Sequence, residues 1–63
     1  MDPNAALGTL RAAVVEWEQA VTAEDDAARL AIATRAFEAL IALDDWLSGG
    51  GFLPTAWRSR TYL

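Results

Sequence analysis

Carboxylates are the main side chains in this sequence that could act as acid–base or metal-binding groups. The chain has nine acidic residues and no His or Cys, so Ser-His-Asp and Cys-His nucleophilic sites are excluded. Two acidic pairs lie close along the chain, Glu16 with Glu18 and Asp44 with Asp45. Residues one or two apart on a helix point to different faces, so neither pair can hold one substrate. Carboxylates from two subunits could meet around a metal, but bundle sites of that kind normally add a Glu-x-x-His motif. We therefore expect no enzyme, no cofactor and no metal site.

Two further segments could be taken for binding motifs. The acidic run Glu24-Asp25-Asp26 lacks the central Gly and the alternating oxygen ligands of a calcium loop, and it reads as a capped turn. The glycines at 49–51 follow a helical pattern and precede no Gly-Lys-Ser/Thr, so they are not a phosphate loop. Neither segment predicts a ligand.

Two Arg lie between two aromatic residues in the segment Trp57-Arg58-Ser59-Arg60-Thr61-Tyr62. Such a segment could stack nucleotides, which leaves a small-molecule or nucleic-acid binder as one hypothesis. Two Arg are few against a net charge of −4, and a phosphate-binding surface needs a basic face. A docked Trp57 with solvated Arg side chains is the favoured interpretation, and nucleic acid is not an expected partner.

The composition indicates one small domain that needs additional support. A core formed by 63 residues rarely supplies more than about 3–5 kcal/mol, and without Cys or His neither a disulfide nor a usual zinc site can add to it. The hydrophobic fraction is 54%, which is high for so short a chain. A partner chain is therefore the expected support.

The first helix is expected over residues 3–22. Asp2 can cap it and Pro3 suits its first turn. Leu7, Leu10, Val14, Trp17 and Val21 then follow the alternating spacing of three and four that defines a heptad stripe. Alanines at 6, 13 and 20 lie along one edge of this stripe, where small residues let a neighbouring helix approach closely.

The second helix is expected over residues 26–48, with Asp25 or Asp26 as its cap. Its apolar arc is wider than one partner helix can cover. Leu30, Phe37 and Ile41 share one side of this arc. The arc continues through the positions Ile32, Leu40, Leu43, Trp46 and Leu47. One part should pack on the first helix, and the other needs the C-terminal tail or a second subunit. Asp44 lies inside the arc, so it requires either an Arg partner, with Arg11, Arg58 and Arg60 as candidates, or a partly exposed position.

The tail, residues 49–63, begins with a glycine helix stop and continues with an apolar segment. We expect Phe52, Leu53 and Trp57 to fold back over the open end of the hairpin and 54–58 to form a short helical turn. The expected core or interface positions are then Leu7, Leu10, Val14, Trp17, Val21, Leu30, Ile32, Phe37, Leu40, Ile41, Leu43, Trp46, Leu47, Phe52, Leu53 and Trp57.

The run from Leu43 to Trp57, with its Asp-x-Trp-Leu, Gly-Gly, Phe-Leu-Pro and Trp elements, resembles the C-terminal signature of small helical proteins encoded by mycobacteriophages and other actinobacteriophages. The similarity covers the last third of the chain closely and the rest only in its Ala-rich composition. The resemblance implies a phage origin and a shape, and it carries no chemistry and no functional residues.

The sequence as a whole predicts an all-α protein: a helical hairpin in one domain, 1–63, with a short C-terminal docking segment, which pairs into a four-helix bundle. The acidic start, the absence of an apolar leader and the lack of about 20 successive apolar residues predict a soluble, cytoplasmic protein with no membrane partner. The expected function is a non-enzymatic, self-associating protein-interaction module that binds a host or phage protein. The alternative is an inhibitor or antitoxin-like acidic protein that covers a host protein with its apolar face.

Overall fold

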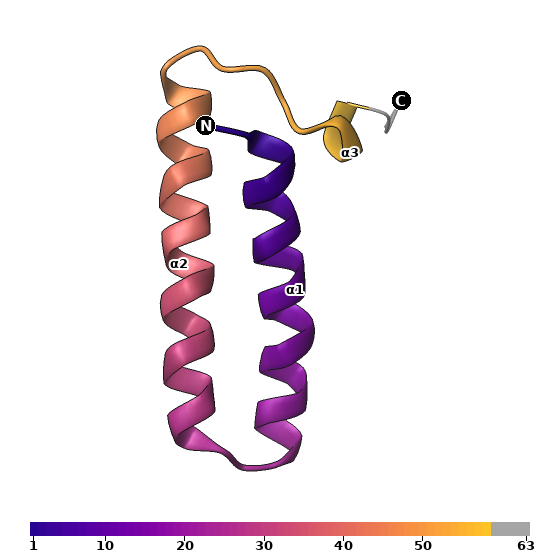
Figure 1. The fold of residues 1–63 in the computed structure, drawn as a ribbon, viewed down its shortest axis with the longest axis vertical. Helices are drawn as coiled ribbons and strands as arrows, with labels where there is room; N and C mark the ends of the chain where they lie inside the picture. The colour runs from indigo at the N-terminus through magenta and orange to yellow at the C-terminus, as the bar shows by residue number, and fades with distance from the viewer. Residues whose placement is uncertain (59–63) are drawn as a thin grey trace.

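The computed structural model describes residues 1–58 as two long antiparallel helices and a short third one (Figure 1). Helix α1 spans Pro3–Thr22, α2 spans Asp26–Ser48 and α3 spans Thr55–Arg58. The all-helical hairpin is confirmed, and the bounds of α1 and α2 coincide with those expected from the sequence. Within residues 1–58 the two long helices form a single layer, and no other described helix runs along either broad side of it.

Capping residues determine where the long helices begin and where α1 ends. The Asp2 carboxylate accepts hydrogen bonds from the backbone N–H groups of Asn4 and Ala5, and the Asp25 carboxylate accepts one from Ala28. Two backbone hydrogen bonds end α1: the N–H of Glu24 donates to the carbonyl of Val21, and the N–H of Asp25 donates to the carbonyl of Ala20. This is a Schellman motif, and it places Glu24 in the left-handed region at φ 54°. Three residues therefore suffice to reverse the chain.

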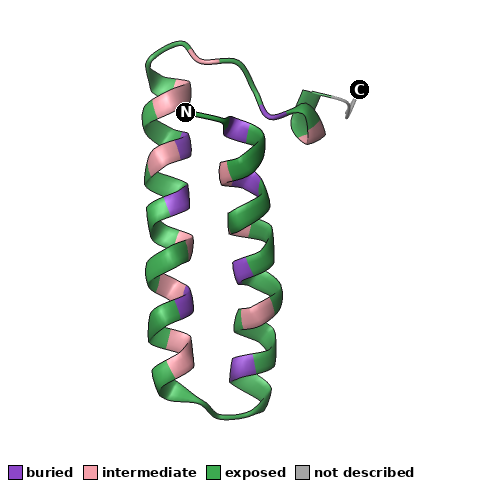
Figure 2. Cartoon of the chain, in the orientation of Figure 1, coloured by how far each residue is buried: buried purple, intermediate pink, exposed green. Residues whose placement is uncertain are grey.

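The core between α1 and α2 is built mainly from small side chains. Ala13, Ala20 and Ile32 form the buried cluster, with Ala28 and Ala36 packed against it. Figure 2 shows the buried positions on the facing sides of the two helices. Because an alanine adds only one carbon, the helices can approach closely along this line.

The heptad stripe of α1 is not what faces α2. Leu7 is buried and Leu10 is half-buried, but Val14, Trp17 and Val21 are exposed. The second helix packs instead on the alanine edge of that stripe, which rotates the larger side chains toward one broad side of the hairpin.

A second Schellman motif ends α2. Gly50, at φ 89°, donates its N–H to the carbonyl of Leu47, and Gly51 donates to Trp46 at 2.8 Å. The Trp46 indole N–H in turn donates to the carbonyl of Phe52 at 2.9 Å. The two rings meet edge to face, with centroids 5.3 Å apart. Trp46 therefore makes its specific contacts within its own chain.

The segment after α2 crosses the open end of the hairpin and brings α3 to the start of α1 (Figure 1). The Thr55 N–H donates to the Asn4 side-chain oxygen at 2.7 Å, and Pro3 and Pro54 are both fully buried. Phe52, Leu53 and Trp57 remain exposed, so these three side chains do not form an internal cover for the helix ends.

None of the helices in the described part of the chain is long and apolar enough to cross a membrane.

Candidate interaction face

The most prominent surface feature of the hairpin is a group of exposed apolar side chains on one broad side. Leu30 is 73% exposed and Phe37 is 63% exposed, whereas Phe and Leu are among the residues most often buried in folded proteins. We define the apolar face by its members, which are Val14, Trp17, Val21, Leu30, Phe37 and Leu40.

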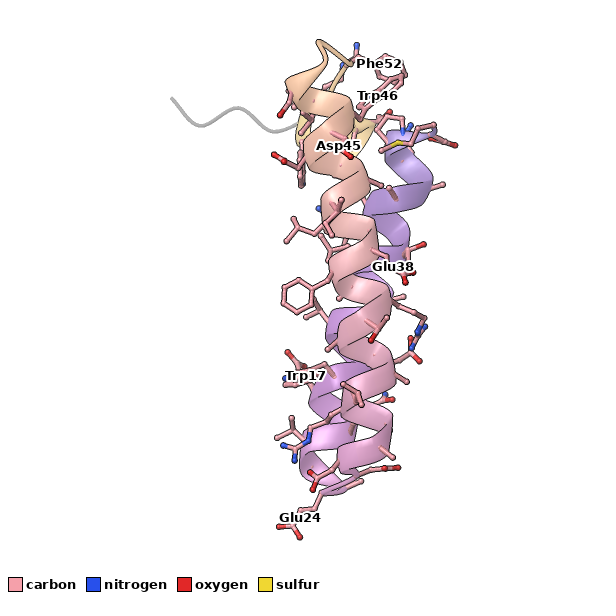
Figure 3. All side chains as sticks on the ribbon, turned by 90° about the vertical axis from the view of Figure 1, so that its left-hand side faces the viewer. Trp17, Glu24, Glu38, Asp45, Trp46 and Phe52 are labelled. Carbon is pink, nitrogen blue, oxygen red and sulfur yellow. The ribbon has the colours of Figure 1, made fainter. Side chains whose placement is uncertain are left out.

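Helix periodicity places the members from α1 on one side of the hairpin. Val14 and Val21 each follow a buried alanine, Ala13 or Ala20, by one residue. One residue rotates the side chain by about 100°, so both valines lie beside the line of contact with α2. Trp17 lies between them at helical spacing, and Figure 3 shows it projecting on one side of the hairpin while Glu38 projects on the other.

An ion pair between the helices marks the opposite broad side. The Arg35 guanidinium donates to both Glu16 carboxylate oxygens, at 3.2 and 3.0 Å. These hydrogen bonds hold the pKa of Glu16 below its ordinary value and raise that of Arg35. Both side chains are about half-exposed, so water screens the attraction and the pair serves chiefly to align the helices.

The same ion pair sets the register in which the two helices contribute to the apolar face. Glu16 lies level with Arg35, and in an antiparallel hairpin each step forward on α1 is a step back on α2. Val14 is therefore level with Phe37, and Val21 with Leu30. The apolar face therefore crosses both helices, from the level of Leu40 to the level of Val21 and Leu30 near the turn.

The chain exposes more surface than a compact monomer of its mass. The solvent-accessible area is 4600 Å² for a mass of 6.8 kDa, whereas compact monomers of this mass expose roughly 3,950 Å².

The polar candidates do not assemble into a site within residues 1–58. That part of the chain has no pocket and no group of three or more side chains able to hold a metal ion. Asp44 is exposed, and it makes no ion pair with Arg11 or Arg58, two of its three candidate partners. Arg60 and Tyr62 lie outside the described residues.

The expected core or interface positions divide into three groups. Leu7, Ile32 and Leu43 are buried between the helices or at their ends, and Leu10, Trp46 and Leu47 are half-buried. The exposed group comprises Val14, Trp17, Val21, Leu30, Phe37, Leu40, Ile41, Phe52, Leu53 and Trp57. Sequence reasoning did not assign Ala13, Ala20 and Ala39 to the core, where the structure buries them, although the sevenfold spacing of the first two was the available signal.

No family model, curated protein or solved structure matches this chain.

Proposed function

We propose that this protein is a non-enzymatic interaction module that associates with itself through the apolar face. One observation carries the proposal: six large apolar side chains lie exposed together on one broad side of a single helix layer. Layers of that kind are stable when a second layer covers them. Two copies stacked on this side form a four-helix bundle, which is the simplest closed solution for two hairpins.

The segment after α2 completes the unit as a docking segment. The Asn4–Thr55 hydrogen bond and the buried Pro3 and Pro54 support its attachment to the start of α1. Phe52, Leu53 and Trp57 stay exposed in one chain, and Figure 3 shows Phe52 on the side opposite Trp17, outside the apolar face. We also propose an actinobacteriophage origin, for which the sequence pattern of the C-terminal third is the only support.

A charge placed on the apolar face tests the proposal. In one chain Phe37 is 63% exposed, so covering the rest of a ring that can bury about 200 Å² is worth roughly 3 kcal/mol for each copy. Phe37→Asp removes this gain and adds a carboxylate that would have to be desolvated. We expect its dissociation constant to rise at least about a hundredfold over the native one.

The matched control is Ala31→Asp, which adds the same charge to an exposed position on α2 outside the apolar face. Sedimentation velocity should show monomers for Phe37→Asp and native-sized particles for Ala31→Asp. Equal masses for all three proteins would show that the apolar face is not the contact surface.

The alternative is an inhibitor or antitoxin-like protein whose apolar face covers a different protein. The acidic net charge of −4 favours a basic target surface in that case. A folded native chain that stays monomeric at every concentration would favour this alternative over self-association.

A further inference from the structure

The outer edge of the apolar face on α1 carries two opposite charges, Arg11 and Glu18. Both residues are exposed, and neither makes an ion pair with another residue in the described range 1–58. They are seven residues apart, so they lie on the same line of the helix. Each stands next to the valine line of the apolar face, three residues before Val14 or Val21. Their charges would therefore face whichever helix covers α1.

Two arrangements can stack a second copy on the apolar face. When the two hairpins point the same way, α1 of one copy lies over α2 of the other. When they point in opposite directions, α1 lies over α1 and α2 over α2, because the two-fold axis then runs across the helices. The two arrangements put different side chains against Arg11 and Glu18.

In the same-direction arrangement, the base of α2 nearest to the level of Glu18 is Arg29, which already pairs with Asp26. The edge of the apolar face on α2 is formed by Leu30, Thr34 and Phe37 at that level, and only Asp44, near the far end, comes toward Arg11. In the opposite-direction arrangement both charges are matched. A two-fold axis midway between Arg11 and Glu18, level with Val14, brings each of them against the opposite charge of the second copy.

We propose that the occupant of the apolar face is a second copy of this chain, docked in the opposite direction with α1 against α1. This inference rests on the proposed self-association and specifies its geometry. Two reciprocal Arg11–Glu18 ion pairs select the arrangement, as flanking charges do in antiparallel coiled coils, and charge complementarity acts mainly on orientation and specificity.

Single charge reversals at Arg11 and Glu18 test this orientation, because a mixture of the two variants should dimerise better than either variant alone. Arg11→Glu makes both edge positions negative, and Glu18→Arg makes both positive. Each variant alone opposes like charges across the two-fold axis, whereas a heterodimer of the two restores both ion pairs. Native mass spectrometry of the mixture should show a heterodimer-to-homodimer ratio several-fold above statistical mixing, and added salt should reduce the excess.

The control for mixing is Glu38→Arg with the native chain, because Glu38 lies outside the apolar face (Figure 3). This pair should mix statistically. Statistical mixing of Arg11→Glu with Glu18→Arg, or a mixture that stays monomeric while the native chain dimerises, would overturn the proposed orientation. A native chain that does not dimerise would instead overturn the proposed function, so the two failures are distinguishable.

A covalent cross-link gives an independent measurement, because the chain contains no Cys. Val14→Cys places a thiol next to the proposed two-fold axis, and a disulfide across that axis requires a Cα separation of about 4.4–6.8 Å. Mild oxidation should convert this variant to a linked dimer. The control, Thr9→Cys, is exposed and lies seven residues before Glu16, on the ion-pair side of α1. A native-sized Val14→Cys dimer that does not cross-link would contradict the orientation.

Discussion

Gly51 stands where the chain passes closest to Trp46, and replacing it with Ala should loosen the end of α2. A Cβ at this position would lie 2.3 Å from Trp46 Nε1 and 2.4 Å from Cε2. Atoms do not approach so closely, so the indole has to move or the segment after α2 has to shift. Either movement separates the indole N–H from the Phe52 carbonyl, 2.9 Å away, and the two rings from each other.

The cost follows from the contacts that are lost. A hydrogen bond contributes about 1 kcal/mol net, and an edge-to-face aromatic pair about 0.5–1.5 kcal/mol. The loss of both gives a destabilisation of roughly 2 kcal/mol. In a domain of this size, such a loss lowers Tm by on the order of 10 °C. This is a large share of the ~3–5 kcal/mol that so small a core supplies.

Thermal melts by circular dichroism, at one fixed protein concentration, measure the effect, since self-association would make Tm depend on concentration. The control is Gly8→Ala, an exposed helix position where an added Cβ meets nothing within 4 Å, which should stabilise by about 0.5–1 kcal/mol. The indole N–H of Trp46 should also exchange with solvent faster in Gly51→Ala. If that variant melts like the native protein and keeps a protected indole, the close packing described for Gly51 is refuted.

Three further predictions concern the hairpin itself. Glu24→Gly should raise the free energy of unfolding by about 1 kcal/mol, because φ 54° strains any residue with a side chain; a lower Tm would contradict the Schellman geometry. Ala13→Leu should destabilise by about 1–3 kcal/mol, since Ala13 is 0% exposed between the helices, while the exposed neighbour Ala12→Leu should change little in the same urea titration. Glu16→Gln should lower stability above pH 4.5, the ordinary pKa of Glu16, and this difference should vanish as the pH falls through its lowered folded pKa. A difference from the native chain that does not change with pH would mean that the Arg35 ion pair is not the cause.

The helix ends were predictable because single residues determine them. Asp2 followed by Pro3, and Asp25 before an Ala-rich run, are local signals that need no knowledge of the partner helix. The glycines at 49–51 likewise stop a helix by their backbone freedom. Glu24 was not expected in the left-handed region, since the turn geometry imposes that conformation on whichever residue stands there.

The side of α1 that faces α2 was not predictable from hydrophobicity alone. The heptad stripe and the alanine edge are neighbours on the same helix, and either could meet a partner. The structure uses Ala13 and Ala20, because close approach between two helices gains contacts along their whole length. Trp17 and Phe37, the larger side chains, are thereby left for a different surface. The hydrophobic pattern of a sequence shows which residues are apolar, but it does not show which helix packs against each of them.

Sedimentation equilibrium of the native chain over a wide concentration range tests the proposed self-association most directly. We predict a mass twice the 6.8 kDa of one chain, which falls toward 6.8 kDa only on dilution and with a simultaneous loss of helical signal or stability. A single folded species of 6.8 kDa at every concentration would contradict the proposal that the apolar face binds a second copy.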